Sequence, residues 1–247
     1  MDLGIAGRAA LVTGGSAGLG LASAQALAAA GARVCLVARG AERLAAAVAE
    51  LPDGGAVITA DLSDPAAVEV MVAEARVALG QIDILVANAG GPPPGNFAST
   101  DLKAYPAALQ LNMLSTIAMC KTLVPDMQNQ GWGRVVAITS AAVREPIPQL
   151  ILSNTARSGL TGFLKTTARE VASDGVTVNS VQPGIHATDR MSQLYDNLDE
   201  LAATIPSGTV GDPADFGSVV AFLCSEPARF ITGAALPVDG GAVRGLQ

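Results

Sequence analysis

The sequence predicts an α/β fold in which helices cover both faces of a doubly wound, seven-stranded parallel sheet. Short apolar runs alternate with helical patterns from one end of the 247 residues to the other, which is typical of βαβ units. Half of the residues are hydrophobic, aromatic residues make up only 3%, and the mean hydropathy is +0.41. Such a composition suits strands that are apolar on both sides. No linker, repeat or low-complexity segment divides the chain, so residues 1–247 are expected to form one domain.

The strands are predicted from apolar runs that end at glycine, proline or polar residues. They cover residues 8–13, 33–38, 56–59, 82–87, 134–139, 176–181 and 234–238. The helices are predicted from longer segments, with Gly31 as a stop after the first and Pro65 at the first turn of the third. They cover residues 19–30, 42–51, 65–79, 102–127, 150–172 and 213–223, and Pro106 and Pro125 are expected to shorten the helix at 102–127.

Composition argues against several classes of partner. The net charge is −7 and the pI is about 4.6, and no run of lysine and arginine offers a surface for nucleic acid. No uninterrupted apolar stretch reaches the roughly 18 residues of a membrane span, and the N-terminal residues lack the features of a signal peptide. Cys35, Cys120 and Cys224 are far apart and show no metal-ligand spacing. We therefore expect a cytoplasmic protein that binds no metal, membrane or nucleic acid.

A glycine-rich turn joins the first predicted strand to the first predicted helix. It reads TGGSAGLG over residues 13–20, with glycines at Gly14, Gly18 and Gly20. Residues without side chains permit a tight turn and a close approach of the backbone to a pyrophosphate, while the helix N-terminus supplies free N–H groups and a positive dipole end. The strand–turn–helix context therefore predicts a dinucleotide phosphate site.

Further motifs follow this turn in a fixed order along the whole chain. Asn88-Ala89-Gly90 closes the fourth predicted strand, Asn112 lies in the long fourth helix, and Ser140 ends the fifth strand. Pro183-Gly184 with Thr188 follows the sixth strand, and residues 231–233 (ITG) lead to residues 238–241 (VDGG). The ordered set resembles the short-chain dehydrogenase/reductase family, which has a Rossmann fold, and looks closest to its bacterial 3-oxoacyl-thioester reductase branch.

The resemblance implies how a nicotinamide dinucleotide would be bound. Gly14, Ser16, Gly18, Leu19 and Gly20 would hold the pyrophosphate and its ribose. Asp61 and Leu62 would flank the adenine, and Asn88, Ala89 and Gly90 would pass beneath the adenosine ribose. Pro183, Gly184, Ile185 and Thr188 would surround the nicotinamide end, and Arg157 would bind the nicotinamide ribose.

The end of the second strand indicates which cofactor is preferred. An acidic residue there would bind the ribose 2′-OH of NAD. This chain has Ala38-Arg39 instead, and a guanidinium can pair with a 2′-phosphate or stack on adenine. We therefore expect NADP(H) to be preferred over NAD(H), although Arg39 as a solvated residue at a helix start stays an alternative.

The reaction centre departs from the family pattern. The resemblance implies an asparagine, a serine and a Tyr-x-x-x-Lys motif, and Asn112 and Ser140 match the first two. Thirteen positions after Ser140 stands Ser153, and four positions further stands Arg157. Residues 158–163 (SGLTGF) also match the family, which argues against a slip in register. Ser153 and Arg157 share one helix face, but an aliphatic hydroxyl is a far weaker acid than a phenol with a pKa of about 10.

Another group would then have to move the proton. His186, the only histidine, has a suitable pKa range, Tyr195 follows on the same loop, and a bound water is an equal candidate. A structural role for His186 is the competing interpretation. Residues 185–211 are expected to form a substrate lid at the carboxyl edge of the sheet.

Three functions stay open at this point. The first is an NADP(H)-dependent oxidoreductase with a Ser/Arg centre, acting on a carbonyl or secondary alcohol of a small-molecule or acyl-thioester substrate. The second is a nucleotide-binding regulatory or scaffold protein without catalysis. The third is a different reaction, such as elimination, with a structural cofactor. The resemblance also implies a homotetramer or dimer built on the helices at 102–127 and 150–172 and on the final strand.

Overall fold

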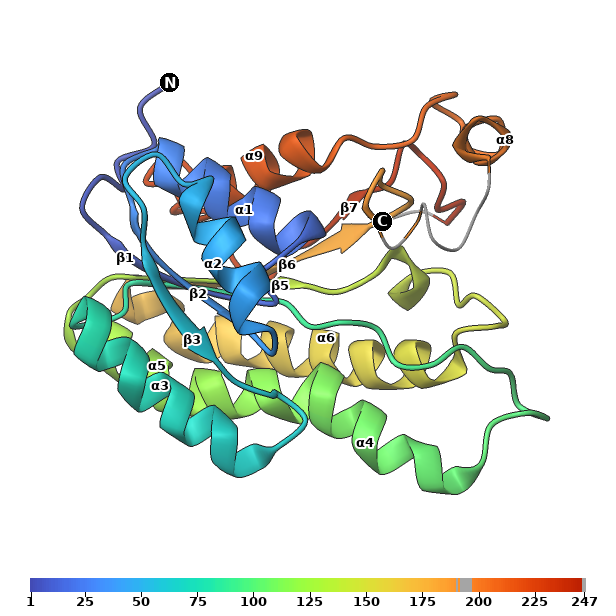
Figure 1. Cartoon of the computed structure of the whole chain (residues 1–247), viewed down its shortest axis with the longest axis horizontal. Helices are drawn as coiled ribbons and strands as arrows, with labels where there is room; N and C mark the ends of the chain where they lie inside the picture. The colour runs from blue at the N-terminus through green and yellow to red at the C-terminus, as the bar shows by residue number, and fades with distance from the viewer. Residues whose placement is uncertain (190, 192–196, 246–247) are drawn as a thin grey trace.

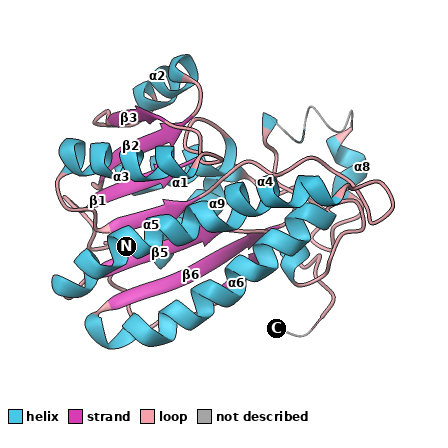
Figure 2. Cartoon of the chain, turned by 90° about the horizontal axis from the view of Figure 1, so that it is seen from below, coloured by secondary structure: helices cyan, strands magenta, loops and turns pink. Residues whose placement is uncertain are grey.

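The predicted seven-stranded parallel sheet is confirmed by the structure, a computed structural model that describes residues 1–189, 191 and 197–245. The strand order is β3-β2-β1-β4-β5-β6-β7, and every pair of neighbours is parallel. Figure 2 labels β3, β2, β1, β5 and β6 in this order across the sheet. The chain therefore winds outward from β1 in two directions, which places a switch point between β1 and β4. The strands are β1 (Ala9–Thr13), β2 (Arg33–Ala38), β3 (Ala56–Thr59), β4 (Ile84–Ala87), β5 (Gly133–Ile138), β6 (Val176–Pro183) and β7 (Ala235–Val238).

Helices cover both faces of the sheet, as Figure 1 shows. One layer holds α1 (Gly18–Ala29), α2 (Ala41–Ala49) and α9 (Pro213–Leu223), and the other holds α3 (Pro65–Leu79), α4 (Tyr105–Leu109), α5 (Ser115–Asn129) and α6 (Ile151–Val171). Alternate residues of β1 belong to two separate cores, with Ala9 and Leu11 in one and Ala10 and Val12 in the other. This two-sided burial explains the high mean hydropathy.

Local signals set several boundaries where the sequence predicts them. The ranges of β2, β3, α3 and α9 are the predicted ones. Two of these helices begin with the same device, an Asp N-cap followed by proline. Ala66 N donates to Asp64 Oδ1 over 3.0 Å, and Ala214 N donates to Asp212 Oδ1 over 2.8 Å. The aspartate satisfies an N–H group that the first turn leaves without a partner.

The long helical run after β4 differs from its prediction. It consists of a 3₁₀ turn (Leu102–Ala104), α4, a π turn (Gln110–Leu114) and α5. The expectation that Pro125 shortens it is wrong, because α5 continues to Asn129. Leu123, Val124 and Met127 are buried in the core around Pro125, and this packing offsets the missing hydrogen bond.

The run Leu102–Asn129 is also the one helix among the described residues that is long and apolar enough to cross a membrane by length and composition alone. Its most apolar window has a mean hydropathy of 1.2 and is 44% buried inside the fold. Core helices pass the same test, and α5 packs against α3, β5 and α6. We therefore interpret it as a core helix.

The segment after β6 contains more regular structure than predicted. Its base is closed by a parallel bridge between His186 and Gly211, and a five-residue helix, α8 (Leu198–Ala202), begins at the N-cap Asn197. Figure 1 shows α8 on the side toward which β6 points. Tyr195, one of the proposed proton sources, lies outside the described residues.

Candidate active site

The glycine-rich turn forms a cradle that only residues without side chains fit. Gly14 and Gly18 have φ values of +58° and +53°, a region that favours glycine. A Cβ on Gly20 would overlap the carbonyl oxygen of Gly14 and would lie 2.7 Å from Asn88 Nδ2. The turn therefore leaves its backbone bare at the start of α1, which has no side-chain cap of its own. This is the geometry that a pyrophosphate requires.

Thr13 and Asn88 hold the cradle to the end of β4. Thr13 Oγ1 donates to Asn88 O over 2.8 Å and accepts from Asn88 N over 2.9 Å, while Asn88 Nδ2 donates to Gly14 O over 3.3 Å. Both strands end here, on either side of the switch point. The sequence interpretation did not assign Thr13 a role; its position directly before Gly14 was the available signal.

The remaining residues of the predicted cofactor set differ in burial and in their contact with this turn. A Cβ on Gly18 would come within 3.4 Å of Thr188 Cγ2, so the start of the segment after β6 lies against the turn. Ser16 and Leu19 are half-buried in the turn itself, whereas Leu62 is buried in the core below α3. Pro183, Gly184 and Ile185 are half-buried where β6 ends.

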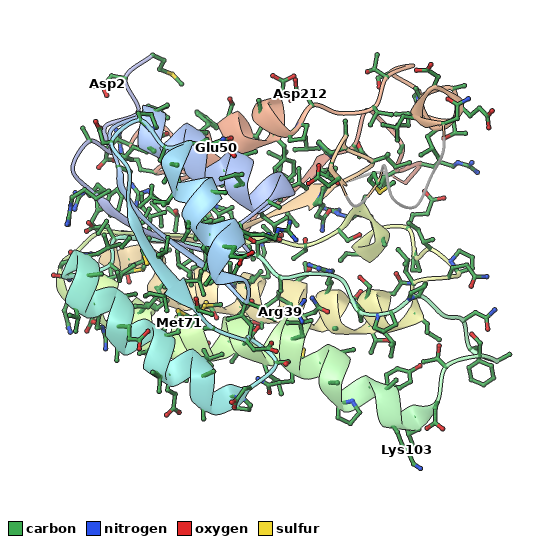
Figure 3. All side chains as sticks on the ribbon, in the orientation of Figure 1. Asp2, Arg39, Glu50, Met71, Lys103 and Asp212 are labelled. Atoms are coloured by element: carbon green, nitrogen blue, oxygen red, sulfur yellow. The ribbon has the colours of Figure 1, made fainter. Side chains whose placement is uncertain are left out.

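Arg39 lies exposed directly after β2, beside α2, where Figure 3 labels it. It is close enough to Asp61, which follows β3, to affect the charge of that carboxylate. The pKa of Asp61 is lowered, first by the hydrogen bonds from the backbone N–H and the hydroxyl of Ser63 and, after a small opposing effect of burial, by the charge of Arg39. The ends of β2 and β3 thus bring together the predicted ribose and adenine residues.

Asn112 occupies the middle of the π turn between α4 and α5 and is only 2% exposed. Its Nδ2 donates to Gly90 O over 2.8 Å, whereas its Oδ1 is buried without a hydrogen-bond partner. A π turn is rare and often lies at a functional site. A buried acceptor without a partner is a place where a water or ligand atom is expected.

Ser153 and Arg157 project from one face of α6, and each is 7% exposed. Arg157 Nη1 donates to Ile138 O over 2.9 Å and Nη2 donates to Ala89 O over 3.2 Å. The guanidinium therefore joins the carboxyl ends of β4 and β5 to α6. Among the residues that the structure describes, the hydroxyl of Ser153 makes no hydrogen bond.

Ser140 stands two residues after Ile138, where β5 gives way to a 3₁₀ turn, Ala141–Val143. Its Oγ accepts from Ala142 N over 3.1 Å. Since a hydroxyl has one proton and two acceptor lone pairs, the proton of Ser140 stays available for a ligand oxygen. The side chains of Ser140, Arg157 and Asn112 are thus tied to neighbouring backbone at one edge of the sheet.

His186 lies where the segment after β6 is closed by the bridge to Gly211. Its ring is 5% exposed and lies edge-on to Phe216 of α9, with 5.0 Å between ring centroids, and Nδ1 is 3.3 Å from Gly184 O. A Cβ on Gly211 would lie 2.6 Å from the His186 ring. Burial lowers the pKa of His186, against smaller opposing effects of Gly184 and Asp212. Burial thus favours the neutral form of the ring.

Comparisons with known proteins agree with this architecture. A family profile described as enoyl-(acyl carrier protein) reductase matches residues 14–243. The 3-oxoacyl-[acyl-carrier-protein] reductase FabG of Escherichia coli is 35% identical over 237 residues, which cover 95% of this chain and 97% of that protein. Nodulation protein G of Azospirillum brasilense is 35% identical over 241 residues, covering 94% and 96%.

Solved structures show the same fold over the full length. L-sorbose reductase from Gluconobacter frateurii, complexed with NADPH and L-sorbose, superposes with a TM-score of 0.94 at 30% identity and covers 100% of both chains. YwfH, an NADPH-dependent reductase involved in bacilysin biosynthesis, has a TM-score of 0.91 at 26% identity and covers 97% and 99%.

The fold and the site define the class of nicotinamide-dependent oxidoreductases. Within that class, the chain belongs to the short-chain dehydrogenase/reductase family and is similar to its FabG-like members.

Proposed function

We propose that this chain transfers hydride between NADP(H) and a carbonyl or secondary alcohol, with Ser153 and Arg157 where its family uses tyrosine and lysine. The observation that carries this proposal is the clamp of Arg157 on Ala89 O and Ile138 O. It brings α6 against the ends of β4 and β5, beside a cradle shaped for a pyrophosphate. Family relatives named as 3-oxoacyl reductases and an NADPH complex of a sugar reductase support the same reaction class.

The residues of the chain divide the work of this reaction among them. The nicotinamide, when bound, supplies or accepts the hydride. The Ser140 hydroxyl donates a hydrogen bond to the substrate oxygen, because its bond with Ala142 N uses a lone pair and leaves its proton available. Arg157 keeps a positive charge at the ends of β4 and β5 but cannot release a proton near neutral pH.

Proton transfer is the step of the reaction that the replacement of tyrosine by Ser153 changes. We propose that a water held by Asn112 Oδ1 and the Ser153 hydroxyl delivers it, since both groups lack a partner among the described residues. His186 is the weaker candidate, because its ring is packed against Phe216 and its pKa is lowered. A positioned general acid contributes roughly 10²- to 10⁴-fold, so turnover is expected to be slow.

The proposed preference for NADP(H) rests on Arg39. It is exposed after β2, in a position where a carboxylate would favour NAD. We propose that its guanidinium pairs with the 2′-phosphate. The substrate side is open to both an acyl thioester and a small hydroxyketone, in keeping with the relatives' names.

Nicotinamide absorbance during turnover tests the proposal. Purified protein is assayed with NADPH and NADH against 3-oxoacyl thioesters, sugar ketones and secondary alcohols. We expect slow oxidation of NADPH with at least one class of substrate. Arg39→Gln should raise KM for NADPH about tenfold and leave KM for NADH unchanged, because it removes one charge-assisted pair with the 2′-phosphate. Equal effects on both nucleotides would remove Arg39 from the phosphate site.

A nucleotide-binding protein without catalysis is the second candidate. Two observations favour this function. At least two N–H groups of Arg157 are already bound to backbone carbonyls, and the Ser153 hydroxyl is a poor acid. Tight NADPH binding with no turnover on any substrate class would establish this second function over the first.

A further inference from the structure

A cavity lies outside the candidate active site, between α6 and the β6–β7 edge of the sheet. Its volume is ≈ 390 Å³, and Figure 2 shows α6 running beside β6. Val143, Leu164, Val178 and the pair Ala234–Ala235 form apolar walls. No cofactor role is expected of any lining residue. The cavity lies at the edge of the sheet, because β7 is the last strand in the order and α6 packs on its neighbour β6.

Three side chains that line this cavity, Gln182, Arg144 and Lys165, carry hydrogen-bond donors. Gln182 is fully buried, and its Nε2 has no partner, while its Oε1 accepts from Arg144 Nε over 3.0 Å. Because arginine can only donate, this bond fixes the amide orientation and turns the NH₂ group of Gln182 away from Arg144. Ser180, 2% exposed, points from the same face of β6 and lines the same cavity.

Two positively charged side chains, Arg144 and Lys165, line the same cavity and bind backbone carbonyl groups. Arg144 Nη2 donates to Ala235 O over 2.7 Å, and Lys165 Nζ donates to Gly233 O over 2.9 Å. Over the described part of the chain, neither residue belongs to a salt bridge. In a protein of net charge −7, an unpaired Arg–Lys pair around a buried donor is a local site of the opposite sign.

We propose that this cavity binds a small organic carboxylate. The carboxylate would accept hydrogen bonds from Gln182 Nε2, Lys165 and Arg144, and a short aliphatic body would lie on Val143 and Leu164. Donors alone would suit a free inorganic anion equally, but the apolar walls favour a ligand with a carbon chain. This inference stands apart from the proposed hydride transfer, since it uses none of the same side chains.

The cavity is nevertheless connected to the candidate active site through two short segments. Arg144 directly follows the 3₁₀ turn that Ser140 begins. Thr161, another lining residue, donates from Oγ1 to the carbonyl oxygen of Arg157 over 2.8 Å, one turn earlier on α6. A ligand in the cavity would contact the two segments that carry Ser140 and Arg157. Through them, binding of the ligand would regulate the candidate active site.

Calorimetric titration with hexanoate, set against its neutral counterpart hexanamide, tests the proposal at low ionic strength, with and without saturating NADPH. We expect one hexanoate to bind per chain, and hexanamide to bind about tenfold more weakly. Arg144→Gln and Lys165→Gln should each lower the affinity for hexanoate about tenfold, as removal of a charge-assisted donor predicts. Gln182→Glu should abolish binding, because its carboxylate would pair with Arg144 itself.

Arg169→Gln is the matched control, since Arg169 is exposed one turn beyond Lys165 on α6 and does not line the cavity. It should bind hexanoate as the unchanged protein does. Equal affinity for hexanamide, equal losses in Arg169→Gln, or competition between hexanoate and NADPH would each overturn the proposal. The proposal would also be overturned if hexanoate fails to bind and sedimentation shows that Arg144→Gln and Lys165→Gln dissociate an oligomer. The cavity would then be part of an interface with a second copy of the chain.

Discussion

Ser153 and Arg157 decide what the candidate site can do, and the structure separates their roles. Arg157 is a clamp, with donors on the carbonyls of Ala89 and Ile138. Ser153 is buried beside it on the same helix face, and its hydroxyl makes no bond among the described residues. The sequence predicts that both residues share a face of one helix. It could not predict the clamp, because the two carbonyls lie 19 and 68 positions away along the chain.

Gly20 gives a residue-scale test of the nucleotide cradle. In Gly20→Ala the new Cβ would meet Gly14 O and Asn88 Nδ2. Since Gly14 belongs to the glycine-rich turn and Asn88 holds that turn to the end of β4, we expect the Kd for NADPH to rise tenfold or more and the free energy of unfolding to fall by about 1–3 kcal/mol. Fluorescence titration and denaturant unfolding measure the two effects.

Gly162→Ala provides the control for that substitution. Gly162 is exposed in the middle of α6, and a Cβ there meets no atom within 4 Å. The variant should gain about 0.5–1 kcal/mol through helix propensity and should bind NADPH unchanged. Unchanged NADPH affinity in Gly20→Ala would show that the cradle is not the pyrophosphate site.

His186 makes stability depend on pH. Burial lowers the pKa of His186 in the folded protein below its ordinary value of 6.5. Between these two pKa values, the unfolded chain binds a proton that the folded protein does not bind. The free energy of unfolding should therefore decrease as pH falls from 7 toward the folded pKa, by at most about 1.4 kcal/mol per pH unit from this group. Above pH 7 this contribution is fully present.

Denaturant unfolding of the unchanged protein and of His186→Gln between pH 5 and 8 measures this effect. The difference between the two proteins should narrow as pH falls. A pH–rate profile that His186→Gln shifts would contradict the structural role and return the histidine to the reaction.

The π turn at Gln110–Leu114 is the element that gives the site its geometry. The extra residue in one turn lets Asn112 face Gly90 while Ser115 and Thr116 remain buried on α5. Sequence periodicity cannot reveal such a turn, because a single inserted residue in a long helix only shifts the phase of the pattern. The prediction that Pro125 shortens the helix was wrong because local sequence rules do not include tertiary packing. Packing against the core keeps α5 helical on both sides of Pro125.

Asn112→Ala tests whether this element positions chemistry or only stabilises the fold. We expect it to lower the free energy of unfolding by about 1–2 kcal/mol, through the lost bond to Gly90 O, and to lower kcat. Asn179→Ala is the control. Asn179 is fully buried on β6 and bonds to Ile231 O and Ala234 N, so its loss should destabilise at least as much while the folded fraction keeps its kcat. Equal kcat in both variants would sink the catalytic assignment of Asn112.

At the scale of the whole molecule, the parallel sheet explains why scattered motifs meet. Asn88 follows β4, Ser140 follows β5 and Gly184 follows β6, and parallel strands end at one edge. The alternation of apolar runs was therefore enough to predict the fold class, and with it the edge of the sheet at which these motifs meet. It was not enough to predict α8, whose five residues are too short for a periodic signal, or the donor-lined cavity beside β7, which depends on contacts between distant segments.

Deuterium transfer from NADPH deuterated at both hydrogens of the nicotinamide C4 tests the central claim most directly. The protein is incubated with this nucleotide and the 3-oxoacyl thioester and sugar ketone substrates, and the products are analysed by mass spectrometry. The account predicts an alcohol carrying one deuterium on the carbon that bears the new hydroxyl, formed slowly by the unchanged protein and more slowly by Ser140→Ala. Bound NADPH with no deuterated product from any substrate would contradict it.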